Sequence, residues 1–204
     1  RVDDDVWLDR IGGMTRLVVG CMTGTSIDSI DGALVRISGK GLHLSAEFIR
    51  GNSAPLGPLA PRLRRLADQE PMTAGEIAAL SREFSLAHVP LIRELITGEK
   101  ADLIAVHGQT VFHQPPVSWQ MLTPAPIARE LRTPVVFDLR AADLASGGQG
   151  APITPIADWV FFRHHERPAA VVNLGGFCNV TLLDRGPEPA EIDHQTMQAL
   201  ATAE

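Results

Sequence analysis

The chain has 204 residues, 45% of them hydrophobic, and a formal net charge of −6 at pH 7. This length and composition predict a globular protein with one good hydrophobic core or two small ones. The negative charge, with no basic block to offset it, argues against nucleic acid as a partner. No apolar run reaches the roughly 18 residues of a membrane span, and the acidic N-terminus is unlike a secretory leader. The sequence therefore predicts a cytoplasmic protein that does not enter a membrane.

The two cysteines give little sign of a disulfide. Cys21 and Cys178 both lie in apolar, strand-like contexts, and nothing in their spacing pairs them. Because cytoplasmic thiols are kept reduced, we expect two reduced cysteines inside the core.

A hairpin opens the predicted fold. The apolar run Leu17–Val19 predicts a buried strand, and the run from Ala33 to Ile37 predicts the strand that returns beside it. Between them, residues 20–31 carry hydroxyls, a flexible glycine and two carboxylates. A rigid scaffold would therefore aim this polar turn.

Further strands and one long helix follow in chain order. A strand is expected at Leu42–Ile49, and a break rich in Gly, Pro and Ser over 51–61. Thr73 and Glu76 form a capping box for an amphipathic helix that we expect to kink near Pro90. The remaining predicted strands cover residues 102–106, 133–137, 168–174 and 180–183. Strands that alternate with helices after an opening meander predict a mixed α/β sheet.

The turn at residues 20–31 has the groups for phosphate and metal binding. Backbone N–H groups around Gly24 and the side chains of Thr25 and Ser26 can donate to phosphate oxygens, and Asp28 or Asp31 can hold a hydrated magnesium ion. The turn lacks the lysine of the Walker pattern. A polar hairpin tip without ligand remains the alternative.

A second polar cluster follows the strand expected at 133–137. Asp138 and Asp143, with Arg140 between them, supply a base and a cation. The glycines of the run 147–150 let backbone approach a ligand closely, and Pro152 is expected to open the next helix. The alternative is structural, with an Asp–Arg pair that pins a glycine loop. In α/β sheets, ligands bind at the carboxyl ends of strands, so both clusters are where a site is expected.

A third cluster runs from His107 to Thr110, after the strand expected at 102–106. Zinc would need a third ligand beside His107 and His113, so hydrogen bonding to a polyol is favoured. Gln120, after Trp119, can add a sugar contact. A serine-hydrolase elbow is excluded, because Asp28 stands where that motif requires glycine.

Four segments together resemble one known family. Residues 20–31, 107–113, 138–152 and 173–181 occur in the order seen in anhydro-N-acetylmuramic acid kinases. The resemblance runs from about Arg16 to Leu183. It implies an actin-like, sugar-kinase fold related to ribonuclease H, with two domains and ATP in the cleft between them. It also implies that a 1,6-anhydro sugar is opened by water and phosphorylated, giving N-acetylmuramic acid 6-phosphate in cell-wall recycling.

The resemblance also assigns roles to individual residues. Asp143 matches the catalytic aspartate, and Asp28 is implied to act through magnesium-bound water. The segment Gly24–Asp31 is implied to lie at the ATP phosphates. The implied nucleotide contacts are Gly24, Thr25, Ser26, Ile27, Asp28, Ser29, Ile30, Asp31, Asn173, Gly175, Gly176 and Asn179. The implied sugar contacts are His107, Gln109, Gln120, Asp138, Arg140, Gly148 and Gln149.

The sequence departs from the family in two places. Ser29 stands where the family usually has glycine, which adds a Cβ at the phosphate turn. Family members are also nearly twice as long, and their aspartate-threonine-glycine-proline-glycine-asparagine motif is not found. We therefore predict an extension over 1–15, a kinase-like domain over 16–183 and an atypical tail over 184–204, with the second domain largely missing.

Three functions remain open from the sequence. The first is the anhydromuramic acid kinase, and the second is a kinase for another anhydro sugar such as levoglucosan. The third is a non-catalytic sugar-binding or assembly domain without the nucleotide half. An incomplete cleft would leave apolar surface exposed, so we expect a homo-oligomer or a complementary half-chain as partner and little kinase activity from the chain alone.

Overall fold

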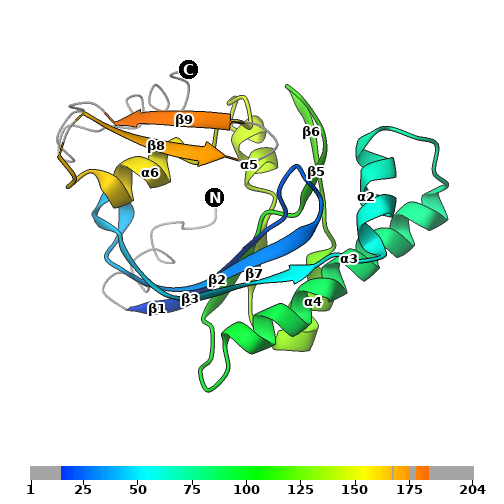
Figure 1. The fold of residues 1–204 in the computed structure, drawn as a ribbon, viewed down its shortest axis with the longest axis horizontal. Helices are drawn as coiled ribbons and strands as arrows, with labels where there is room; N and C mark the ends of the chain where they lie inside the picture. The colour runs from blue at the N-terminus through cyan, green and yellow to red at the C-terminus, as the bar shows by residue number, and fades with distance from the viewer. Residues whose placement is uncertain (1–14, 167, 175–177, 184–204) are drawn as a thin grey trace, which may run out of the picture.

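The computed structural model describes residues 15–166, 168–174 and 178–183. A five-stranded mixed sheet in the order β3-β2-β1-β4-β7 forms the centre, and two smaller two-stranded sheets, β5–β6 and β8–β9, lie beside it (Figure 1). Helices flank the sheets. The predicted α/β fold with a mixed sheet and flanking helices is confirmed.

An antiparallel meander makes up one side of the central sheet. β1 (Arg16–Met22) pairs with β2 (Ser29–Ser38), as the hairpin prediction required. After a short 3₁₀ helix, η1 (Gly41–His43), β3 (Ser45–Pro55) pairs with β2. The strand expected at 42–49 therefore begins later and runs six residues further. The break expected from residue 51 was wrong as far as Pro55, because pairing with the start of β2 overrides the turn preference of Gly51 and its neighbours.

Parallel strands make up the other side. β4 (Leu103–Val106) runs parallel to β1, and β7 (Val135–Phe137) runs parallel to β4. Cys21, Val106 and Phe137 are adjacent in register across the three strands. Both strands lie where the sequence predicted them. The carboxyl ends of β1, β4 and β7 consequently meet at one edge of the sheet.

Helices pack against one face of this sheet. α3 (Ala74–Leu95) and α4 (Pro124–Leu131) run along it, and α2 (Leu59–Ala67) packs against α3 and β5 (Figure 1). The predicted capping box at Thr73 and Glu76 is present, and α3 continues through Pro90. α2 was not predicted, since the prolines around it suggested a loop. None of the helices in the described segments is long and apolar enough to cross a membrane.

The core lies between the sheet and these helices. Val19, Leu34 and Ile104 from the sheet are fully buried against Leu80 and Phe84 of α3. Burying one such side chain contributes roughly 1.5–3 kcal/mol relative to leaving it in water. This packing gives β1, β4 and β7 a rigid support.

Two short elements follow the parallel strands and were not predicted. The hairpin of β5 (Gln109–Gln114) and β6 (Val117–Met121) extends beyond the end of β4. Helix α5 (Leu139–Ala145) begins directly after β7 and packs against β6. Both elements stand at the edge where the parallel strands end.

The last described elements form a separate layer above the open face of the sheet (Figure 1). α6 (Pro155–Phe162) begins three residues after the expected start at Pro152. It packs on β8 (Ala169–Leu174) and β9 (Cys178–Leu183) through a small cluster that includes Trp159 and Leu183. The strands expected at 168–174 and 180–183 are thus present, with β9 two residues longer.

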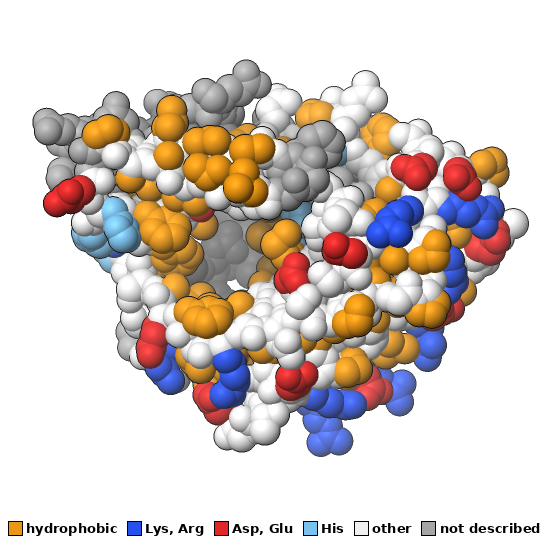
Figure 2. All heavy atoms as spheres, in the orientation of Figure 1, with side chains coloured by type: hydrophobic (Ala, Val, Ile, Leu, Met, Phe, Trp, Pro, Cys, Tyr) orange, Lys and Arg blue, Asp and Glu red, His pale blue; other side chains and the backbone are white. Residues whose placement is uncertain are grey.

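The outer face of the β8–β9 hairpin is apolar and exposed. Its exposed side chains are Val172, Leu174, Val180 and Leu182, and Figure 2 shows hydrophobic atoms gathered there. Cys178 lies on this hairpin and is exposed, so its predicted place in the core was wrong. Cys21 is buried as expected, and burial raises the pKa of its thiol to about 12. Both cysteines are free thiols.

Candidate active site

Three polar segments leave the sheet at the same edge. The β1–β2 turn follows β1, His107 follows β4, and Asp138 follows β7. The backbone N–H of His107 donates to the carbonyl oxygen of Cys21 at 2.9 Å, which extends the pairing of β4 with β1. The structure therefore brings together the turn, His107 and the segment that contains Asp138 and Arg140. This edge is where open α/β sheets bind ligands.

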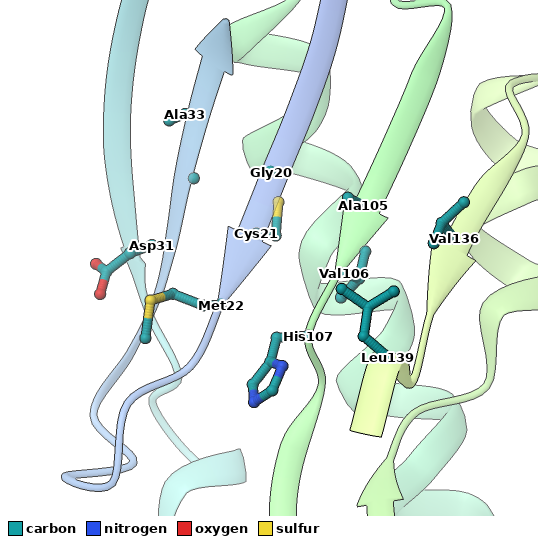
Figure 3. Close-up of a pocket in the computed structure, with 11 residues that line it drawn as sticks. Gly20, Cys21, Met22, Asp31, Ala33, Ala105, Val106, His107, Val136 and Leu139 are labelled. Atoms are coloured by element: carbon teal, nitrogen blue, oxygen red, sulfur yellow. The ribbon is translucent and has the colours of Figure 1, made fainter. Parts of the chain in front are cut away.

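A cavity of about 460 Å³ lies at this edge, on the sheet face opposite α3 (Figure 3). Gly20, Ala33 and Ala105 are neighbours in register, and their small side chains leave the hollow. Asp31 and His107 bring polar groups to its lining, and the rest is mainly apolar. Figure 2 shows a hollow below the β8–β9 hairpin with hydrophobic side chains around it. A space of this size is typical of sites for small molecules.

The β1–β2 turn presents an ionised carboxylate. The hydroxyl of Ser26 donates to Asp28 Oδ1 at 2.8 Å. This bond is the main cause that lowers the pKa of the exposed Asp28 carboxyl. Ile27 and Ile30, two of the predicted nucleotide contacts, have buried side chains. Only their backbone groups can therefore face a ligand. Thr25 and Ser26 are exposed.

Hydroxyl groups connect the two acids of the turn. Ser29 Oγ donates to Asp28 Oδ1 at 3.4 Å and to Asp31 Oδ1 at 3.2 Å. Ser53 of β3 donates to the same oxygen of Asp31 at 2.6 Å. Ser29, the departure from the family pattern, therefore contacts both carboxylates.

The turn suits magnesium better than a metal held by protein ligands alone. Within the described ranges, no three His, Cys, Asp or Glu side chains group to hold a metal. Mg²⁺ is commonly held by one or two carboxylates together with water and substrate phosphate, which the exposed Asp28 can provide. Thr23 adds a hydroxyl that is buried and has no hydrogen-bond partner among the described residues. The residues present therefore fit a magnesium–phosphate ligand.

Asp143 is held by the glycine-rich loop that follows α5. Its Oδ2 accepts from the backbone N–H of Gly150 at 2.7 Å. A Cβ added at Gly148 would lie 2.2 Å from the same oxygen, so only glycine allows this approach. Among the described residues, no hydrogen bond is made by Asp143 Oδ1. The half-buried carboxylate thus keeps one oxygen for a substrate or water.

Asp138 and Arg140 shape the same segment. Asp138 has a φ of 51° and caps α5, with Oδ1 accepting from the N–H of Ala141 at 3.1 Å. Arg140 Nη1 donates to the carbonyl oxygen of Gly150 at 2.7 Å. Since Arg140 and Asp143 both bond the backbone of Gly150, the structural interpretation of this loop holds in part. The two residues therefore fix the loop that follows α5.

Burial and charge set the protonation state of this group. Burial lowers the pKa of His107, as does the positive charge of Arg140, while Asp138 opposes the shift. His107 is therefore neutral at pH 7. Burial also lowers the pKa of Arg140, but a guanidinium stays protonated in proteins. The site offers a neutral imidazole, a cation and carboxylates.

The two predicted glutamines lie buried in the β5–β6 hairpin. Thr110 Oγ1 donates to Gln120 Oε1 at 2.8 Å, and Gln109 Nε2 donates to the carbonyl oxygen of Thr110 at 3.1 Å. Gln109 Oε1 and Gln120 Nε2 remain buried without a partner in the part of the chain that the structure describes. Such atoms are costly to bury and suit a polar ligand. His113 instead bonds Ser118 at the exposed end of the hairpin.

The remaining predicted residues differ in where they lie. Gln149 is exposed in the loop after α5, between Gly148 and Gly150, which both bond Asp143. Asn173 and Asn179 form an exposed cross-strand pair in the separate β8–β9 sheet. Gly175 and Gly176 fall outside the described residues.

Sequence reasoning overlooked two residues at the turn. Thr23 is the first residue after β1 and lies within the predicted turn, but the sequence analysis gave it no role. Arg64 of α2 donates from Nη2 to the carbonyl oxygen of Ser26 at 2.9 Å. No local pattern reveals this contact, because the two residues are far apart in sequence.

Comparison with known proteins identifies the family. The family model for anhydro-N-acetylmuramic acid kinase matches residues 16–201. The chain belongs to this family. The resemblance found in the four ordered motifs is confirmed.

Curated relatives carry the same description. The protein named anhydro-N-acetylmuramic acid kinase from Synechococcus sp. (strain CC9311) is 38% identical over 186 residues, and the match covers 84% of this chain and 48% of the relative. The protein of that name from Gloeobacter violaceus is 38% identical over 188 residues, and the match covers 86% of this chain and 50% of the relative. The one from Bacillus thuringiensis subsp. konkukian is 34% identical over 81% of this chain. The chain spans about half the length of these relatives.

Proposed function

We propose that this chain carries the sugar site and the phosphate turn of an ATP-dependent kinase. The kinase opens 1,6-anhydro-N-acetylmuramic acid and phosphorylates it to N-acetylmuramic acid 6-phosphate. One observation carries the proposal: the ends of β1, β4 and β7 place the β1–β2 turn, His107 and the Asp138–Gly150 segment at one edge. The name that the relatives carry supplies the substrate.

The sugar is proposed to lie at His107 and the segment after β7. Neutral His107 and charged Arg140 can both donate hydrogen bonds to a polyol. Gln109 and Gln120 each hold a buried polar atom without a partner among the described residues. Gly148 and Gln149 bring the loop backbone beside Asp143. Asp138 positions Arg140 and His107 through its charge and its cap on α5.

The nucleotide is proposed to lie at the β1–β2 turn. Asp28 would hold Mg²⁺ through bound water, and Gly24, Thr25 and Ser26 would donate to phosphate oxygens. Ser29 and Asp31 keep Asp28 in place, while Ile27 and Ile30 contribute backbone only. Bound Mg·ATP would supply the phosphoryl group. Asn173, Gly175, Gly176 and Asn179 are proposed as further nucleotide contacts.

Asp143 is proposed as the general base. A water molecule attacks the anomeric carbon while its proton passes to Asp143. The bond from this carbon to the bridging oxygen breaks, and that oxygen keeps the electron pair. The freed oxygen would then form a bond to the γ-phosphorus of ATP while the bond from that phosphorus to ADP breaks and ADP leaves, so no separate acid is needed. Arg140 and His107 orient the sugar for this attack, because positioning supplies much of the rate of phosphoryl transfer.

The cellular setting follows from the substrate. An anhydro sugar of this kind arises from cell-wall breakdown, so we place the enzyme in the cytoplasm in cell-wall recycling. The domain is proposed to span residues 16–183, between an extension over 1–15 and a tail over 184–204. The apolar outer face of β8–β9 is proposed to contact a second copy or a complementary half-chain.

Mass spectrometry of the product tests the proposal. The purified chain is incubated with Mg·ATP and 1,6-anhydro-N-acetylmuramic acid in two mixtures. One contains the chain as its only protein, and the other also contains the half of the Synechococcus relative that this chain does not match. The expected product gains both a phosphoryl group and one water. A product that gains only the phosphoryl group would contradict ring opening at Asp143. No product in either mixture, with no sugar binding by calorimetry, would refute the function.

Calorimetry with and without magnesium tests the nucleotide part. The turn has carboxylates but no lysine, so the metal must neutralise phosphate charge. We expect ATP binding in the presence of Mg²⁺ and a loss of at least about tenfold in affinity with a chelator. Equal affinity in both conditions would remove Asp28 as the magnesium residue.

A further inference from the structure

The β1–β2 turn contains a conformation that needs outside support. Ile27 has a φ of 50°, in the left-handed region that β-branched residues rarely adopt. Its side chain is only 4% exposed and belongs to the main core. Its N–H donates to the carbonyl oxygen of Gly24 at 3.1 Å, which closes the turn. A strained residue of this kind persists only where its surroundings fix it.

Two contacts from distant segments fix the turn. The N–H of Leu56, just after β3, donates to the carbonyl oxygen of Asp28 at 2.9 Å. Arg64 of α2 donates from Nη2 to the carbonyl oxygen of Ser26 at 2.9 Å and to that of Ile27 at 3.0 Å. Its Nε also donates to the carbonyl oxygen of Ser26, at 3.3 Å. The Arg64 guanidinium thus donates hydrogen bonds to the peptide groups on both sides of Ile27.

Helix α2 holds Arg64 in place for this contact. Leu63 and Leu66, on either side of it in sequence, are buried in the core. Arg64 itself points away from that core to the turn. A planar fork of donors suits two adjacent carbonyl oxygens, whereas a lysine offers a single point charge on a flexible stem.

We propose that Arg64 is a positioning residue for nucleotide binding, acting through the backbone of Ser26 and Ile27. It holds the turn so that Ser26 and Asp28 keep their mutual hydrogen bond and present the carboxylate outward. Arg64 acts only on the backbone carbonyl groups of Ser26 and Ile27 and does not touch the reacting groups. The inference rests on the proposed nucleotide role of the turn, and it adds a residue that no motif in the sequence marks.

Hydrogen exchange and calorimetry on four proteins test the inference. They are the unsubstituted chain, Arg64→Gln, Arg64→Lys and the control Arg62→Gln. Arg62 lies on the same helix, pairs with Glu83 and makes no bond to the turn. In Arg64→Gln we expect the amides of residues 24–29 to exchange about tenfold faster, as for loss of hydrogen bonds from a charged donor. Mg·ATP affinity should fall by a similar factor, with sugar affinity and melting temperature as in Arg62→Gln.

Arg64→Lys separates position from charge. We expect it to resemble Arg64→Gln, because the lysine lacks the fork. Full recovery of Mg·ATP affinity in Arg64→Lys, with exchange still fast, would show that only the charge matters and would overturn the inference. Unchanged exchange in Arg64→Gln, or an equal change in Arg62→Gln, would also overturn it. If the unsubstituted chain bound no Mg·ATP, the proposed nucleotide role of the turn would be refuted, and with it the proposed role of Arg64 in nucleotide binding. Hydrogen exchange would still show whether Arg64 stabilises the turn.

Discussion

The β1–β2 turn and the segment from Asp138 to Gly150 lie at one edge of one sheet, but they are held in different ways. Distant groups fix the turn: the backbone of Leu56 and the side chain of Arg64. The second segment fixes itself, because its main bonds join Asp138, Arg140 and Asp143 to groups within the segment. The turn should therefore respond to changes far away in sequence, and the second segment to changes within itself.

The largest effect is expected from Asp143→Asn, which tests the self-contained segment. The asparagine can still accept from the N–H of Gly150, so fold and sugar affinity should stay nearly intact. Loss of a general base typically lowers the rate about 100- to 10,000-fold. Turnover is measured in the mixture with the complementary half of the Synechococcus relative, and sugar affinity is measured on the same preparation of the chain. Asp138→Asn is the control and should mainly weaken sugar binding. If Asp143→Asn kept near-normal turnover and Asp138→Asn lost it, Asp138 would be the general base and Asp143 the positioning residue.

Acid should destabilise the turn and the Asp138–Gly150 segment together, because both are attached to the same hydrophobic core. His88 of α3 is fully buried, and burial lowers its pKa to about 4. The unfolded chain then binds a proton below pH 6.5 that the folded chain resists, so stability falls as pH drops from about 6.5 to 4. The expected loss is about 3 kcal/mol. Urea unfolding across this pH range measures it.

The variant His88→Met checks that pH dependence. It should flatten the slope of stability against pH between pH 6.5 and 4, and the slope that remains should come from His107, whose pKa is also lowered by burial. An unaltered slope in His88→Met would assign the acid sensitivity to other groups.

Gly148→Ala should damage the self-contained segment without touching the turn. The new Cβ would lie 2.2 Å from Asp143 Oδ2, so the carboxylate must move and lose its bond to Gly150. A displacement of this size can cost up to about 100-fold in rate. Activity and Mg·ATP affinity are compared with Gly75→Ala, where an added Cβ has open space. If Mg·ATP affinity fell by the same factor as the rate, the turn and the Asp138–Gly150 segment would not be held independently, which would contradict the comparison.

The smallest effect concerns the cap of α5. Asp138→Ala removes the side chain that accepts from the N–H of Ala141, and such a loss costs about 1 kcal/mol. Asp138→Asn keeps the cap and tolerates the left-handed backbone, so its stability should match the unsubstituted chain. Thermal unfolding of the two variants measures the difference. Equal stability of Asp138→Ala would mean that the cap does not hold the segment.

The same contrast explains what could be predicted from the sequence. Periodicity and capping located β1, β2, β4 and α3, because these patterns are local. α2 was missed although Leu59, Leu63 and Leu66 repeat at helical spacing, since Pro58 and Pro61 suggested a loop. Prolines are tolerated at the start of a helix, where these two stand.

At the site, the motifs identified the residues but not what holds them. The bond between Asp143 and Gly150 is local, and the alternative interpretation of an Asp–Arg pair that pins a glycine loop indicated such a contact. The hydrogen bonds from Arg64 to Ser26 and Ile27 depend on how α2 packs, and no short sequence pattern encodes that packing. Thr23, Gln109 and Gln120 each have a buried polar atom without a hydrogen-bond partner in the described ranges, and this too becomes visible only in the fold.

A two-ligand titration followed by NMR tests most directly whether this one edge holds both substrates. Mg·ATP and 1,6-anhydro-N-acetylmuramic acid are added separately to the labelled chain, and backbone amide shifts are recorded. Mg·ATP should shift the amides of Gly24–Ser29, and the sugar should shift His107, Arg140 and Gly148–Gly150. Shifts confined to parts of the chain away from the proposed site, such as α3 or α4, would contradict a site built at the ends of β1, β4 and β7.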